Sequence, residues 1–100
     1  MKLTRPVIVG IVKTCIAQIT TRFNPGDMDE STKLQDVDID DDDHVSRLRN
    51  RIYLSVTDTD KAKWNRNDFM VQQTWGPSDD IGAVADGVRN GIASARTPLD

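Results

Sequence analysis

The chain has 100 residues, of which 29% are charged and 37% are hydrophobic, and its formal net charge is −3. This length supports one compact domain with a modest core and excludes a large enzyme fold. The net charge hides an asymmetry. Residues 26–43 hold nine carboxylates and one lysine, a net charge of −8, whereas residues 44–66 have a net charge of +4. The acidic middle of the chain is therefore the feature that a functional interpretation has to explain.

The first predicted element is a helix over residues 5–22, with Thr4 as its cap and Pro6 in its first turn. Apolar side chains recur there at helical spacing, namely Ile8, Ile11, Val12, Cys15, Ile16 and Ile19. Lys13 interrupts the apolar run too early for a secretory signal or a membrane-spanning helix, so we expect a cytoplasmic protein without membrane insertion. The single cysteine, Cys15, lies on the apolar stripe and is predicted to be a core thiol.

Residues 24–40 are predicted to form a long connection that begins with a turn at residues 24–27. Leu34, Val37 and Ile39 are spaced so that they could anchor this loop to the core. The loop ends in the run Asp40, Asp41, Asp42 and Asp43, where carboxylates favour the start of a helix.

The second helix is predicted to begin within residues 40–43 and to fade over residues 55–60. Its apolar stripe consists of Val45, Leu48, Ile52 and Val56. Arg47 and Arg51 lie one turn apart on another face, and Asp43 precedes Arg47 by four residues. His44 is expected to pair weakly with Asp40.

Two further helices are predicted in the C-terminal half. A short one starts at Asn65 or Asn67 and carries Phe69 and Met70, and the last one is capped by Ser78. The last helix has Asp79 and Asp80 in its first turn and an apolar stripe made of Ile81, Val84, Ala85, Val88 and Ile92. Its three glycines, Gly82, Gly87 and Gly91, lower its intrinsic stability, so tertiary contacts must hold it.

Without a period-two run long enough for a sheet, the chain is predicted to be all-α. We expect a single domain over residues 1–100, built as a small four-helix bundle with a long loop between the first two helices and a short third helix. Its core should cover about residues 5–93, with a frayed tail over residues 94–100.

This order of elements is similar to that of acyl carrier proteins, over about residues 5–93. The most specific local match is the segment from Leu34 through Asp38 and Ile39 to the acidic run. In carriers the corresponding segment contains a leucine, a glycine, an aliphatic residue and then Asp-Ser-Leu. The resemblance places Asp40 at the signature aspartate, Asp41 at the serine, Asp42 at the leucine and Asp38 at the glycine.

The resemblance implies a phosphopantetheine-binding fold, but the residues depart from the family at the decisive position. Carriers esterify the serine hydroxyl with 4'-phosphopantetheine, and Asp41 has no hydroxyl. A carboxylate there could serve as an ordinary helix cap, or could imitate the charge of a loaded carrier. The runner-up interpretation keeps carrier function on a misplaced serine, for which Ser46 is the nearby candidate.

Other functions are less well supported by the residues. Asp36, Asp38 and Asp40 alternate like the start of an EF-hand, but the pattern then places Asp41 and Arg47 where glycine and glutamate are required. We therefore expect no dedicated metal site, with weak divalent-cation binding as a second alternative.

Catalysis and nucleic-acid binding are not expected. His44 and Cys15 are single residues without a catalytic arrangement, and the acidic total opposes binding to nucleic acid. Trp64 and Trp75 are predicted to cover the edge of the core near the third helix.

The expected function is therefore protein recognition by an acyl-carrier-like domain that is not an enzyme. The predicted partner-binding residues are Asp40, Asp41, Asp42, Asp43, Arg47 and Arg51. The expected partner has a basic surface, and the resemblance points to enzymes such as those of fatty-acid or polyketide synthesis. Carriers of that family meet their enzymes at this end of the second helix.

Overall fold

The computed structural model describes residues 3–59 and 63–97, and within them the fold is mostly helical. The longer helices are α1 (Arg5–Thr20), α2 (Asp42–Thr59) and α4 (Ile81–Ala95), and a short α3 covers Arg66–Met70. Two single 3₁₀ turns, η1 (Pro25–Asp27) and η2 (Leu34–Val37), lie in the connection between α1 and α2. The prediction of a small helical fold with four helices, a long first connection and a short third helix is confirmed for the described residues.

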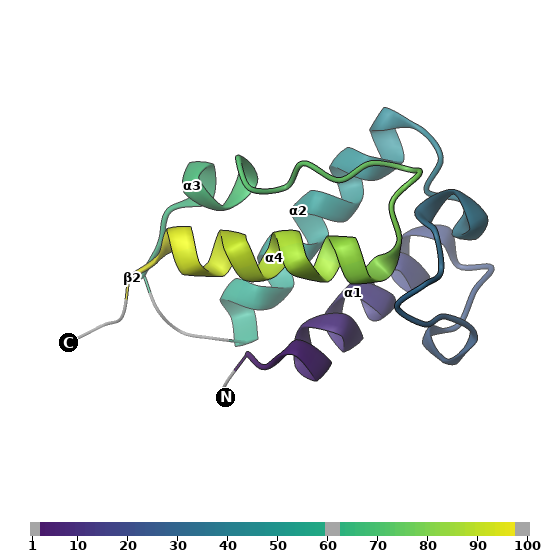
Figure 1. The fold of residues 1–100 in the computed structure, drawn as a ribbon, viewed down its shortest axis with the longest axis horizontal. Coiled ribbons are helices and arrows are strands. Elements are labelled where there is room, and N and C mark those ends of the chain that lie inside the picture. The colour runs from purple at the N-terminus through teal and green to yellow at the C-terminus, as the bar shows by residue number, and fades with distance from the viewer. Residues whose placement is uncertain (1–2, 60–62, 98–100) are drawn as a thin grey trace.

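Figure 1 shows α4 crossing the middle of the molecule with α3 alongside it. Helix α1 packs against both α2 and α4 and so links these two helices. The predicted stripe of α2 is fully internal, since Val45, Leu48, Ile52 and Val56 are all buried. No helix among the described residues is long and apolar enough to cross a bilayer.

The connection between α1 and α2 is anchored as predicted. Leu34, Val37 and Ile39 are buried in the core. Backbone hydrogen bonds also tie this connection to the segment before α4, because the Leu34 amide donates to the Asp79 carbonyl and the Ile81 amide donates to the Thr32 carbonyl. The acidic segment that leads into α2 is therefore held at a fixed place on the bundle.

The C-terminal half departs from prediction at the cap of α4 and at the tail. The cap is Asp80, whose side chain accepts a hydrogen bond from the Ala83 amide at 2.8 Å, and not Ser78. Helix α4 continues to Ala95, which is buried, and strand β2 (Arg96–Thr97) then pairs antiparallel with strand β1 (Lys63–Trp64). Residues 94–97 are therefore ordered by tertiary pairing, contrary to the prediction of a frayed tail, whereas residues 98–100 lie outside the described residues.

Smaller differences concern helix ends. Helix α1 stops at Thr20, two residues earlier than predicted, and Thr4 occupies its N-cap position without a side-chain cap hydrogen bond. Helix α2 continues through Ser55 to Thr59, and the Thr57 and Thr59 hydroxyls donate hydrogen bonds to carbonyls of the preceding turn. Asn65 caps α3 as expected, accepting from the Asp68 amide at 3.1 Å.

The three glycines of α4 are all buried, and two of them allow other side chains to approach the helix closely. A Cβ atom on Gly87 would lie 2.8 Å from Trp75 Cδ1, and one on Gly91 would lie 2.6 Å from Gln73 Nε2 and 2.7 Å from Phe69 Cδ2. The tertiary contacts that the sequence required for α4 are therefore made by Phe69, Gln73 and Trp75 against its glycines.

Candidate functional site

The start of α2 is organised by Asp41, the residue immediately before the helix. Its Oδ1 atom accepts a hydrogen bond from the His44 amide at 2.8 Å and lies 2.7 Å from His44 Nδ1. These contacts lower the pKa of the Asp41 carboxyl, the largest cause being the His44 amide and the next the His44 ring. Asp41 is thus an ionised cap on a helix N-terminus, where the helix dipole also favours a negative charge.

The partner predicted for His44 is wrong by one residue. The imidazole pairs with Asp41 and not with Asp40. The physical reason is the cap itself, because a side chain that reaches the amide three residues ahead also meets the side chain attached there. Asp41 and His44 therefore form one local unit at the start of the helix.

The remaining carboxylates of the run differ in their interactions. Asp43 pairs with Arg47 at 3.0 Å, as the four-residue spacing predicts. Asp40 and Asp42 are exposed, and among the described residues neither side chain has an ion pair or a hydrogen bond. The run thus contains two negative charges that are free to meet a partner.

Several acidic residues of the preceding loop, in contrast, are held by local contacts. The Asp29 carboxylate accepts hydrogen bonds from the amide and hydroxyl of Ser31, and these lower its pKa. Glu30 pairs with Arg5 at 2.7 Å, and Asp38 pairs with Arg22 at 3.4 Å. Several carboxylates of residues 26–43 are therefore engaged in contacts within the loop or with α1, whereas Asp40 and Asp42 at the start of α2 have no such partner among the described residues.

The six predicted partner-binding residues all lie on α2 or in the two residues before it. The first five, Asp40, Asp41, Asp42, Asp43 and Arg47, occupy the start of the helix. Arg51 instead donates to Gln18 Oε1 of α1 at 3.2 Å and lines a hollow between α1 and α2. The candidate site is therefore the acidic start of α2 with Arg47 at its border.

The candidate attachment residues differ in their chemistry. Asp41 is exposed but has no hydroxyl and is already engaged as a cap. Ser46 is exposed and lies inside α2, five residues after Asp41. The residue at the position expected for the carrier serine therefore does not fit 4'-phosphopantetheine.

One group of possible metal ligands occurs in the described part of the chain. Ligand atoms of Asp40, Asp41 and His44 lie within 4.8 Å of one another. The EF-hand alternation is not the basis of this group, since Asp36 and Asp38 are not members. A cation here would meet the positive end of the α2 dipole and would compete with the Asp41 cap.

Cys15 and the two tryptophans lie in the core or against it. Cys15 is buried, its Sγ atom lies 3.4 Å from Ser55 Oγ, and burial raises its pKa. Trp75 is also buried and donates to Gln73 Oε1, while Trp64 packs against the core edge. The prediction that these aromatic rings cover the core near the third helix is confirmed.

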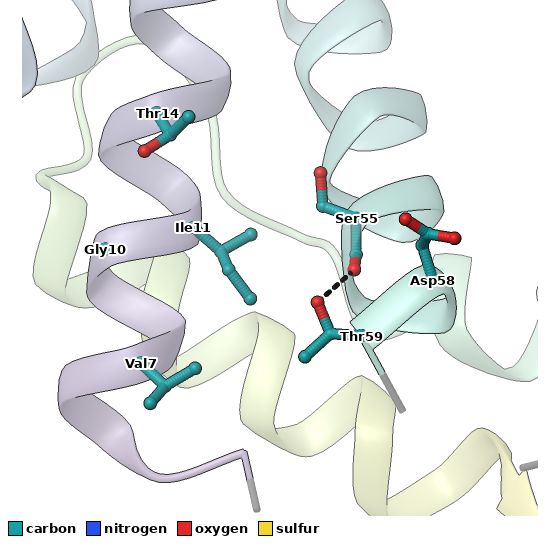
Figure 2. A pocket seen from close by; sticks show the side chains of 7 residues that line it. All are labelled: Val7, Gly10, Ile11, Thr14, Ser55, Asp58 and Thr59. Carbon is teal, nitrogen blue, oxygen red and sulfur yellow. Dashed lines mark hydrogen bonds between the residues drawn. The ribbon is translucent and has the colours of Figure 1, made fainter. Parts of the chain in front are cut away.

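Sequence reasoning missed two features of the surface. The Arg49 guanidinium lies over the Trp75 ring, 5.2 Å from its centroid, and donates a hydrogen bond to the Trp75 carbonyl. This arginine therefore packs against the core, unlike the exposed Arg47 and Arg51. The second feature is a groove between α1 and α2, part of which Figure 2 shows. Two residues in the sequence could have indicated this groove. Gly10 is a glycine inside the first helix, and Leu54 is a leucine outside the apolar stripe of α2.

Comparison with known proteins finds no matching family model, no matching curated protein and no matching solved structure.

Proposed function

We propose that this chain is an acyl-carrier-like recognition domain that binds a partner protein through the acidic start of α2 and carries no prosthetic group. The observation that carries the proposal is the pair of exposed carboxylates on Asp40 and Asp42, which have no ion pair among the described residues. They flank the capping residue Asp41, where the loop that is fixed to the core enters α2. Such a surface suits a partner with a basic patch, because complementary charge speeds encounter and selects partners.

The backbone at Asp38 supports the resemblance to carriers. Asp38 has a φ of 65°, in the left-handed region that favours glycine and that aspartate tolerates better than most residues. Asp38 is the position that the resemblance assigns to the family's glycine. The neighbouring Ile39, assigned to the family's aliphatic residue, is buried as a core residue. Two positions of the altered signature therefore retain the physical requirement of the family's residue.

Asp41 supports the absence of a prosthetic group. It occupies the position assigned to the carrier serine, and its carboxylate supplies the negative charge that a phosphodiester would place at the helix start. A domain of this kind would meet carrier-dependent enzymes, such as those of fatty-acid or polyketide synthesis, without delivering an acyl group.

The proposal is tested by charge neutralisation that leaves the Asp41 cap intact. The double variant Asp40→Asn/Asp42→Asn is compared with Asp36→Asn/Asp68→Asn, which removes two other exposed charges that have no side-chain partner among the described residues. Binding to a panel of purified carrier-dependent enzymes is measured by biolayer interferometry. We expect the first variant to lose binding and the control to retain it. Equal binding by both variants, or no binding to any enzyme by the unmodified chain, would contradict the proposal.

A mass measurement distinguishes the proposal from the alternative that the chain is a carrier. The chain is incubated with coenzyme A and a promiscuous phosphopantetheinyl transferase, and its intact mass is recorded. We expect no change. The addition of one phosphopantetheine would overturn the proposal, and a Ser46→Ala variant would then show whether Ser46 is the site.

A divalent-cation-binding module is a second candidate, favoured by the proximity of Asp40, Asp41 and His44. It predicts a melting temperature that rises on addition of calcium or zinc and a rise that is lost in His44→Gln or Asp40→Asn. An unchanged melting temperature would remove this candidate.

A further inference from the structure

The outward side of the α1 and α2 pair contains a groove that shares only Arg47 with the acidic site. One hollow, of about 470 Å³, is lined by Val7, Gly10, Ile11, Thr14, Ser55, Asp58 and Thr59 (Figure 2). A second, of about 430 Å³, is lined by Gln18, Ile19, Arg47, Asn50, Arg51 and Leu54. The same two helices line both hollows, which therefore follow one another along the pair.

The spacing of the lining residues shows that the groove runs along the helices. On α1 it follows Val7, Ile11, Thr14 and Gln18, which form one helical stripe. The facing stripe on α2 runs in the opposite direction, from Asp58 at the Val7 end to Arg51 at the Gln18 end. From Val7 to Gln18 the groove spans about three turns, or ~17 Å. This is the length and shape that one short helix fills.

Two features of the groove do not serve the internal packing of the free protein. Leu54 is 65% exposed at the second hollow, although it is a large apolar side chain. Gly10 lies in the interior of α1, where glycine costs up to about 1 kcal/mol relative to alanine. A Cβ atom on Gly10 would have no neighbour within 4 Å, so internal packing does not require this glycine. Both features suit a partner whose apolar side chains cover Leu54 and whose backbone approaches α1 at Gly10.

The charges of the groove define the chemistry of that partner. Arg51 has no ion pair among the described residues, whereas Arg47 beside it pairs with Asp43 at 3.0 Å. Asp58 stands at the opposite end. The unpaired cation favours an occupant that brings negative charge to the Arg51 end. A second copy of the groove is a poorer occupant, because two concave surfaces would not fill each other.

We propose that the groove between α1 and α2 binds an amphipathic helix of a partner protein, with an apolar stripe over Ile11, Ile19 and Leu54 and carboxylates over Arg51. This surface lies along the side of α2 and is separate from Asp40 and Asp42, so the proposal does not depend on the function proposed above. The groove and the acidic helix start would then give the domain two binding surfaces.

The test uses a displayed library of peptides of about 18 residues on a helix-forming background, with leucines fixed at i, i+4, i+7 and i+11 and the other positions randomised. Selection on the full chain is expected to enrich aspartate and glutamate at one end of the peptides. Absence of enriched binders, or enrichment without carboxylates, would overturn the proposal.

Two charge-reversal variants of the chain test where the peptides bind. Dissociation constants of the enriched peptides are measured by fluorescence anisotropy against Arg51→Glu and against Arg89→Glu, which makes the same charge change on the exposed part of α4. We expect Arg51→Glu to weaken binding by at least about tenfold and Arg89→Glu to change it by less than about twofold. Equal effects of the two would refute the assignment.

Gly10→Leu fills the groove without removing a charge. It is expected to abolish peptide binding while maintaining or raising the melting temperature, since leucine is a better helix former than glycine. Sedimentation of the unmodified chain identifies the competing occupant. A dimer that Gly10→Leu dissociates would replace the partner helix with a second copy, whereas a monomer agrees with the proposal.

Discussion

Gly91 of α4 and Gly10 of α1 both occupy helix interiors, but their surroundings are opposite. A Cβ atom on Gly91 would collide with Gln73 and Phe69, whereas a Cβ atom on Gly10 would meet nothing within 4 Å. The first glycine serves the internal packing of α3 and the following segment against α4. The second leaves an open surface between α1 and α2. The comparison shows that α4 is held by close contacts at its glycines, whereas the outward side of α1 and α2 has open space beside Gly10.

The largest expected effect on stability comes from the buried hydrogen bonds of Gln73, which lies against α4. Gln73 is buried, donates to the carbonyls of Phe69 and Gly87, and accepts from Trp75 Nε1 at 2.9 Å. Gln73→Leu leaves the buried indole N–H without its acceptor. It should lower the free energy of unfolding by about 3 kcal/mol, measured by urea denaturation.

The matched control is Gln72→Leu, because the Gln72 side chain is partly exposed and has no hydrogen bond among the described residues. Its effect should be within about 0.5 kcal/mol of zero. If both substitutions cost the same, the Gln73 network does not specify the packing of α4.

The second effect tests the close approach of Gln73 and Phe69 to the backbone of α4 at Gly91. Gly91→Ala places a methyl group 2.6 Å from Gln73 Nε2 and 2.7 Å from Phe69 Cδ2, and both side chains are buried. We expect a loss of about 2 kcal/mol by urea denaturation, despite the better helix propensity of alanine. A gain in stability would mean that the α3 side yields to the extra methyl group.

These contacts also show where sequence reasoning ends. The stripe of α2 and the anchoring of Leu34 and Ile39 were predictable, because local periodicity decides which face is buried. The use of Asp80 in place of Ser78 as a cap was not, since both are good caps and the choice depends on backbone pairing with residues 30–35.

The candidate site was predicted in the same partial way. The position of the carboxylates at the start of α2 and the Asp43–Arg47 pair follow from spacing along one helix. The contact of Arg51 with Gln18 depends on the position of α1, which no local pattern encodes. The groove was missed for the same reason, because an open surface is defined by two helices at once.

The third prediction concerns Gly10 of α1, and it is the counterpart of the Gly91 substitution. Gly10→Ala adds a methyl group to the same kind of helical position without a collision. It should raise the free energy of unfolding by up to about 1 kcal/mol, seen as a higher urea midpoint. A destabilised Gly10→Ala variant would indicate that the two glycines have the same role, and the contrast between them would fail.

The smallest effect concerns the charged start of α2 and appears only as a dependence on pH. The pKa of Asp41 is lowered in the folded chain, mainly by the His44 amide, so the ionised carboxylate stabilises the fold above the ordinary value of 3.8. This contribution is lost as the pH falls through the lower folded pKa. Asp41→Asn keeps a capping oxygen but removes the charge.

The unmodified chain should therefore melt slightly above Asp41→Asn near neutral pH, and the difference in melting temperature should shrink as the pH falls below about 3.8. Asp40→Asn is the matched control, because it removes a neighbouring charge that has no side-chain hydrogen bond among the described residues. A difference that stays constant with pH would mean that the capping oxygen alone, and not the charge of Asp41, stabilises the start of α2. The negative charge at the position assigned to the carrier serine would then have no role in the fold, and its role in partner recognition would have to be tested separately.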